Sequence, residues 1–100
     1  MTNPKVHGMI TITQDFETML ICAMRYAIGR ESYMPSIVID YIRFLFPQLS
    51  AKTLFVMKRD IEEEIERYKR MERELYMDKE WQKLAEEIGD MYEKKKAVQE

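Results

Sequence analysis

The chain has 100 residues, of which 46% are hydrophobic and 34% are charged, and its formal net charge is −2. This length builds one domain with a modest core, and the near-neutral charge argues against a strongly electrostatic grip on nucleic acid. A single cysteine, Cys22, excludes an intrachain disulfide and a cysteine zinc cluster. No stretch reaches the roughly 20 apolar residues of a membrane span, so we expect one cytoplasmic domain over residues 1–100.

Residues 1–12 give no clear helical pattern. Asn3-Pro4 and Gly8 are turn or breaker signals, and the apolar residues around them form no stripe. An extended arm or one short strand fits this stretch. Because a lone strand needs a partner, packing of the arm on another protomer is one option.

The first helix is expected to begin after Thr13, whose hydroxyl suits an N-cap, and to end before Gly29, which suits the position just past a helix C-terminus. Apolar residues recur between them at three- and four-residue steps, which predicts a broad apolar face. Cys22 widens that face further. We therefore expect little of this helix to face water and Cys22 to be an inert core residue.

The second helix is expected to begin near Pro35 and to stop before Pro47. Its β-branched residues 37–39 lower helix propensity, so a strand is a minor alternative. The segment is almost wholly apolar. Residues 13–47 thus predict two helices that both belong to the core.

Residues 50–97 predict a long, charged helical hairpin. Ser50 suits an N-cap for a helix from Ala51 to about Met77, and Asp78 suits the start of a last helix. The apolar register slips near Met77, which indicates a turn there, and one continuous rod is the alternative. An apolar stripe runs along the long helix at close to heptad spacing, at Leu54, Met57, Ile61, Ile65, Tyr68, Met71 or Glu72, and Leu75.

That stripe has two interpretations, an ordinary helix–helix core or a seam for an oligomer or partner. Residues 51–100 hold 14 of the 18 acidic and 12 of the 16 basic residues, so their charged face is interpreted as solvated and nucleic acid is not expected as a partner. The predicted fold is a small all-α bundle of about four helices, one of them long. We expect it to form a homo-oligomer.

The junction between the first two helices is the candidate site. Arginine forks bind carboxylate or phosphate through paired hydrogen bonds, and tyrosines stack on bases or on guanidinium groups. This chemistry predicts a site for a small anionic ligand such as a nucleotide. The candidate ligand-binding residues are Arg25, Tyr26, Arg30, Ser32, Tyr33 and Asp40.

A structural interpretation competes with the binding site. Arg25 could pair with Asp40 of the facing helix, and Arg30 with Glu31 or with a carbonyl at the helix C-terminus. The junction would then be a latch between helices. The protein would in that case act as a protein–protein inhibitor or assembly factor through its long helix.

The string Arg25–Tyr33, RYAIGRESY, followed by Asp40, resembles small proteins encoded by bacteriophages and prophages. The resemblance spans roughly residues 20–85, with Ser32 where that family's pattern favours threonine. It implies a phage accessory protein in the host cytoplasm that acts in counter-defence. Sequestration of a signalling nucleotide or inhibition of a host protein is the implied activity.

Enzymatic chemistry has little support in the sequence. Cys22 and His7 would need a third, orienting group, and the acidic run at residues 62–64 lacks accompanying histidines. No phosphate-cradling glycine loop or nucleophile elbow is present. We therefore expect a binding protein without catalytic residues, metal or cofactor.

Overall fold

The computed structural model describes residues 12–99, and this part of the chain is α-helical, with one short 3-10 helix and no strand. The prediction of an all-α fold with four helices is confirmed. The arm predicted for residues 1–12 lies outside the described residues except for Ile12. The elements are α1 (Gln14–Ala27), α2 (Met34–Leu45), η1 (Phe46–Gln48), α3 (Ala51–Arg70) and α4 (Asp78–Gln99).

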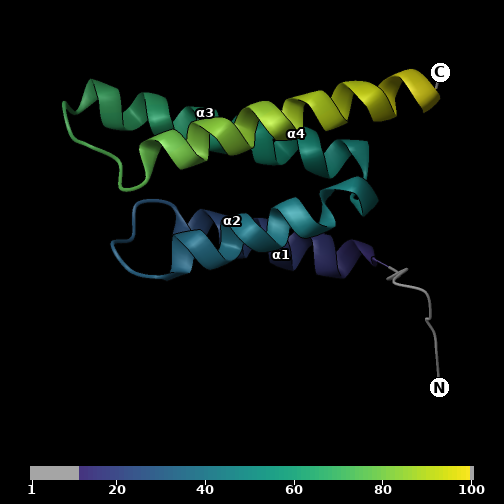
Figure 1. The fold of residues 1–100 in the computed structure, drawn as a ribbon, viewed down its shortest axis with the longest axis horizontal. Helices are drawn as coiled ribbons and strands as arrows, with labels where there is room; N and C mark the ends of the chain where they lie inside the picture. Colours follow the sequence, from purple (N-terminus) through teal and green to yellow (C-terminus); the bar gives the residue numbers. More distant parts are fainter. Residues whose placement is uncertain (1–11, 100) are drawn as a thin grey trace.

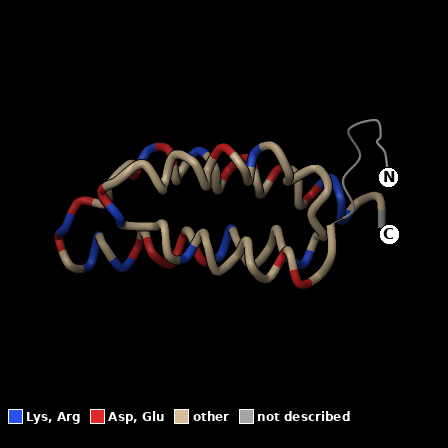
Figure 2. Tube along the Cα trace, turned by 90° about the horizontal axis from the view of Figure 1, so that it is seen from below, with Lys and Arg blue, Asp and Glu red and all other residues tan. Residues whose placement is uncertain are grey.

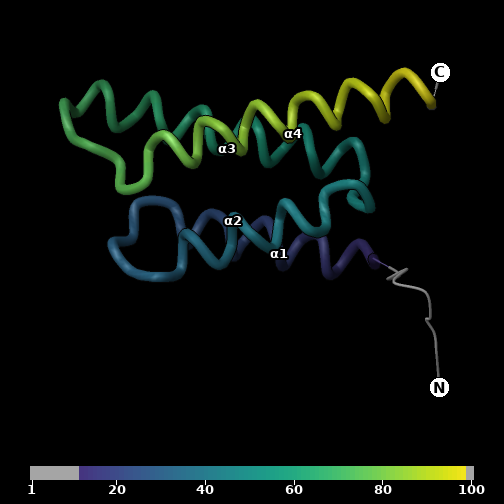
Figure 3. Tube along the Cα trace, in the orientation of Figure 1, coloured from purple at the N-terminus to yellow at the C-terminus, as the bar shows by residue number. Residues whose placement is uncertain are grey.

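The helices form two pairs that lie in two layers (Figure 1). α1 packs on α2 in one layer and α3 packs on α4 in the other, while α1 also contacts α3 and α2 contacts α4. The trace in Figure 3 shows each pair running antiparallel, with η1 leading from the first layer to the second. In the C-terminal half, α3 and α4 are therefore two antiparallel helices packed on each other and not one continuous rod.

Side-chain caps fix the starts of two helices, as the sequence predicted. Thr13 Oγ1 accepts a hydrogen bond from Phe16 N, and Ser50 Oγ accepts one from Thr53 N. Glu17 of α1 links the two layers, because its carboxylate accepts a hydrogen bond of 2.7 Å from Ser50 N and one of 3.0 Å from Thr53 Oγ1. A carboxylate at the N-terminus of α3 also complements the helix dipole.

The core lies between the two layers. Four residues of the predicted stripe are buried there, namely Leu54, Met57, Ile61 and Ile65, which supports the interpretation of the stripe as a helix–helix core. Tyr68 is only partly buried, and Met71, just past the end of α3, is exposed. Trp81, with Leu84 and Ile88 on the same face of α4, is fully buried opposite. The largest fully buried side chains of α1, α2 and α3 are Met24, Ile39, Ile42, Leu54, Met57 and Ile61.

The prediction that α3 continues to Met77 was wrong. The helix ends at Arg70, and Glu72 adopts a positive φ of 54°. Arg73 N donates to Tyr68 O and Glu72 N to Lys69 O, which is the hydrogen-bond pattern of a Schellman C-cap. Glycine usually occupies the left-handed position, so Glu72 gave no stop signal in the sequence.

The expectation that α1 and α2 are core on nearly all sides was also wrong. Cys22 is exposed on α1, and so are Met19 and Tyr26. On α2, Tyr41 and Phe44 are exposed as well. The reason is geometric, since only one side of each helix meets the second layer.

Charged residues are concentrated on α3 and α4 (Figure 2). The α1–α2 layer is mostly uncharged, as the uneven sequence distribution indicated. Among the described residues, no helix is long and apolar enough to cross a membrane.

Candidate functional site

The segment that joins α1 to α2 lines an open depression of about 670 Å³ together with the C-terminal half of α3. The segment and the helix belong to different layers, so the fold brings together residues more than 30 positions apart. The lining residues are Arg25, Tyr26, Ile28, Gly29, Arg30, Glu31, Ser32, Glu64, Arg67 and Tyr68.

Arg25 is oriented by an acid of α3. Its Nε lies 2.6 Å from Asp60 Oδ2, and Asp60 is largely buried while Arg25 remains half exposed. Asp40 lies exposed on α2, so the predicted Arg25–Asp40 latch was wrong. An ion pair between α1 and α3 takes its place, and Arg25 also lines the depression.

Arg30 folds back on the end of α1. Its Nε donates to Tyr26 O at 3.1 Å, and its guanidinium carbon lies 3.8 Å from the centroid of the Tyr26 ring. The predicted bond from Arg30 to a carbonyl at the helix C-terminus is thus confirmed. Within the described part of the chain, this bond uses only Nε and leaves the two terminal nitrogens for other partners.

Gly29 shapes the depression by letting α3 come close. It has a φ of +90°, and Arg30 N donates to Ala27 O at 3.1 Å as the chain turns out of the helix. A Cβ atom at Gly29 would overlap the hydroxyl of Tyr68. Only glycine satisfies both the backbone conformation and this close approach.

Glu64 and Arg67 form a two-point ion pair on α3. Arg67 Nε donates to Glu64 Oε1 at 2.8 Å and its terminal nitrogen to Oε2 at 2.7 Å. The hydrogen bond from Arg67 lowers the pKa of the Glu64 carboxyl, although partial burial opposes the shift. The same hydrogen bond raises the pKa of Arg67. Both groups are therefore charged at neutral pH.

Four of the six candidate residues line the depression, namely Arg25, Tyr26, Arg30 and Ser32. Ser32 Oγ accepts from Met34 N at 3.2 Å and so helps to start α2. Tyr33 is largely exposed at the start of α2, and neither it nor Asp40 lines the depression.

The sequence reasoning missed the contribution of α3 to the site. Glu64 and Arg67 were interpreted as part of a solvated face, and Tyr68 as part of the apolar stripe. Their distance along the chain from the junction left no local signal. The one available hint was the pair of basic and aromatic residues at positions 67 and 68, which repeats the chemistry of Arg25 and Tyr26.

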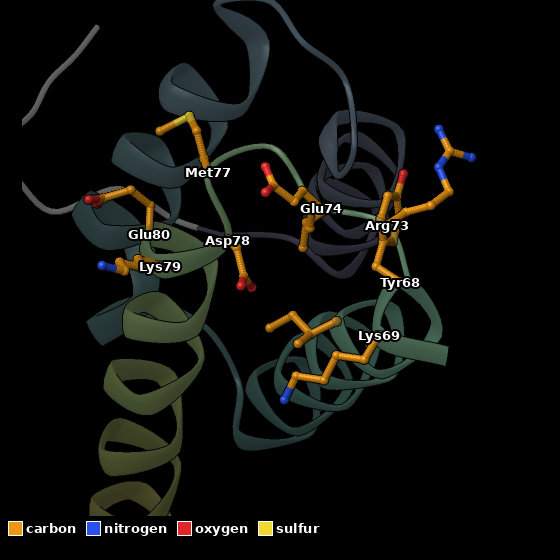
Figure 4. A pocket seen from close by; sticks show the side chains of 10 residues that line it. Tyr68, Lys69, Arg73, Glu74, Met77, Asp78, Lys79 and Glu80 are labelled. Atoms are coloured by element: carbon orange, nitrogen blue, oxygen red, sulfur yellow. The ribbon is translucent and has the colours of Figure 1, made fainter. Parts of the chain in front are cut away.

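A second depression of about 480 Å³ lies where α3 gives way to α4 (Figure 4). Its charged lining residues are mixed in sign, with Lys69, Arg73 and Lys79 beside Glu74, Asp78 and Glu80. In Figure 4 the guanidinium group of Arg73 points away from Asp78. This depression therefore has less positive charge to offer an anion than the junction. Among the described residues, no group of acids, histidines or cysteines is placed to hold a metal ion.

In comparisons with protein-family models, curated proteins and solved structures, the chain gives no significant match. The resemblance to bacteriophage proteins therefore stays a prediction.

Proposed function

We propose that the protein acts by binding, and that the junction depression takes a small anionic ligand. The observation that supports this most is the meeting of three guanidinium groups around one open depression. Arg25 and Arg30 come from the α1–α2 layer and Arg67 comes from α3. Two acids, Glu31 and Glu64, also line it, so the lining residues carry one net positive charge. The Asp60 carboxylate that holds Arg25 lies beside them.

The internal hydrogen bonds of Arg25 and Arg30 orient these side chains and still leave donors on each guanidinium group for a ligand. Each is held through Nε, by a carboxylate in one case and by a carbonyl in the other. The terminal nitrogens can then donate paired hydrogen bonds to a phosphate or carboxylate. An arginine that is held in place loses less conformational entropy when it binds.

The strength of such a site can be bounded. Hydrogen bonds to charged groups contribute about 1.5–3 kcal/mol each, so even one such bond from each of two arginines gives about 3–6 kcal/mol and a Kd on the order of 1 mM. Stacking of a base on Tyr26 or Tyr68 would add about 1–3 kcal/mol. A nucleotide should therefore bind more tightly than inorganic pyrophosphate, and pyrophosphate more tightly than phosphate.

The ligand class follows from this ordering and from the resemblance to phage proteins. A nucleotide supplies both the phosphate and the ring that the arginines and tyrosines can hold. In a phage setting it would be a signalling nucleotide of bacterial defence, which the protein would sequester. The alternative of a host-protein inhibitor acting through α3 has less support, because most of the apolar stripe of α3 is buried in the core.

A thermal-shift titration with phosphate, pyrophosphate, AMP and ATP tests the proposal. A ligand at about ten times its Kd stabilises the protein by about 1.4 kcal/mol, and each kcal/mol raises the Tm of a domain of this size by about 4–8 °C. ATP should give the largest shift. Arg30→Gln should reduce the shift, and Arg30→Lys should restore it only in part, because lysine lacks the planar fork.

Arg70→Gln is the matched control, because Arg70 is an exposed arginine of α3 that does not line the depression. It removes the same unit of charge and should leave the shift unchanged. Equal losses for Arg30→Gln and Arg70→Gln would mean that only the net charge matters. The absence of any shift with the unmutated protein would refute the proposal.

A further inference from the structure

The outer face of the α1–α2 layer carries two exposed apolar rows. Met19, Ala23 and Tyr26 follow one another on α1 at spacings of four and three residues, and Ile37, Tyr41 and Phe44 repeat the same spacings on α2. The five large side chains are between 51% and 64% exposed, and Ala23 is half-buried. Such spacing puts each set on one side of its helix.

The two rows lie on either side of the groove between α1 and α2. Arg25 reaches from α1 to Asp60 of α3, and Arg43 reaches from α2 to Glu87 of α4, 2.7 Å away. These ion pairs fix which side of each helix meets the second layer. The apolar rows lie on the sides turned away from the ion pairs, so they border the groove between α1 and α2 on the outer surface.

The size of this apolar face is unusual for a monomer. An aromatic side chain has about 150–250 Å² of surface. The half-exposed Tyr26, Tyr41 and Phe44, the largely exposed Tyr33 and the half-exposed Met19 and Ile37 therefore expose on the order of 600 Å² together. This value lies at the upper limit of about 300–600 Å² for the largest patch on a typical monomer. It approaches the roughly 800 Å² that each partner contributes to a stable interface.

We propose that this face is the interface of a homodimer, covered by the same face of a second copy. In a two-fold dimer the same patch is used on both subunits, so an apolar face can be covered by the same face of a second copy. The rows contain no lysine or glutamate, which are depleted in interface cores.

The opposite side of the molecule differs sharply. α3 and α4 hold most of the charged residues of the described chain. The other exposed large apolar residues of the described chain occur singly, at Phe55, Met71, Tyr76 and Val98. The outer side of the α3–α4 layer is thus suited to contact with water, and the outer face of the α1–α2 layer is suited to contact with a partner. The face meets the junction depression at Tyr26, which belongs to the α1 row and also lines the depression. The remaining residues of the two rows lie outside the depression, so substitutions at Tyr41 and Ile37 test the dimer without altering the proposed ligand site.

Sedimentation velocity of the full chain over a range of concentrations tests the proposal. The unmutated protein should sediment as a dimer that dissociates on dilution. Tyr41→Glu places a charge in the centre of the α2 row and should weaken dimerisation by about tenfold or more. Because Tyr41 is exposed in the single chain, the circular dichroism spectrum should remain helical.

Phe55→Glu is the matched control, since Phe55 is a half-exposed aromatic residue of α3 outside the face. It should leave the dimer intact. Ile37→Glu provides a second test on the same row should Tyr41→Glu fail to fold. A monomer at every concentration would overturn the proposal, and would mean that residues 1–11, another protein or water covers the face. Equal loss of the dimer in Phe55→Glu would overturn it as well.

Discussion

Replacement of Gly29 by alanine tests the closest approach between the two layers. The φ of +90° is a conformation in which a non-glycine residue costs about 1–3 kcal/mol. The added Cβ would also overlap the Tyr68 hydroxyl, and displacing a packed side chain adds about 1 kcal/mol. Alanine recovers about 0.4–1 kcal/mol by restricting the unfolded chain. We expect a net loss of about 2–3 kcal/mol in the free energy of unfolding.

Urea denaturation followed by circular dichroism measures this loss, and two further variants separate its causes. Tyr68→Phe removes the overlapping oxygen and leaves the nearest ring carbon 3.4 Å from the added Cβ. In that background Gly29→Ala should cost about 1 kcal/mol less. Additive effects of the two substitutions would refute the steric part of the reasoning.

Gly89→Ala is the control for the same chemical change. Gly89 lies inside α4, where alanine is the better helix former by about 1 kcal/mol. Its Cβ would meet only the flexible end of Lys58, at 2.8 Å from Cε. Gly89→Ala should therefore be neutral or stabilising. A loss as large as that of Gly29→Ala would contradict the account.

Three further predictions concern single side chains. Glu17→Gln should lower the free energy of unfolding by about 1 kcal/mol in urea denaturation, because a charge-assisted bond to the start of α3 is lost; no change would contradict this role. Trp81→Phe should cost at most about 1 kcal/mol in the same assay, because Trp81 Nε1 is buried without a hydrogen-bond partner among the described residues and its loss breaks no hydrogen bond. Trp81→Ala should cost about 3–5 kcal/mol, because it leaves a cavity in the core. Equal costs would be inconsistent with that reasoning. Glu64→Gln should lower stability at pH 7 by a few tenths of a kcal/mol. The pKa of Glu64 in the folded protein lies below its ordinary value of 4.5, so the stability difference between the unmutated protein and Glu64→Gln is fully present above pH 4.5. It disappears as the pH falls through the lowered pKa. A stability difference that stays constant in melts over this pH range would refute the prediction.

The sequence predicts the helix starts well because the signals are local. Thr13 and Ser50 cap the helices that directly follow them, and Pro35 lies in the first turn of α2. The end of α3 was missed because Glu72, not glycine, takes the left-handed position. An apolar residue gives no indication of whether it faces its own core or another surface, so the exposed rows of α1 and α2 could not be predicted.

The candidate site was predicted in part for the same reason. Arg25 and Arg30 stand close together in the sequence and both line the depression. Asp60, which orients Arg25, lies 35 residues away, and no local pattern distinguishes it from Asp40 as a partner. Long-range pairing depends on how the layers pack, which only the structure provides.

The most direct test of the proposed function is an NMR titration of ¹⁵N-labelled protein with ATP. We expect chemical-shift changes at the backbone amides of residues 28–32, at the Nε–H of Arg30, and at residues 64–68 of α3. These changes should saturate together with one Kd. Changes centred instead on the lysines at positions 94–96, or no changes at all, would contradict a binding site at the junction.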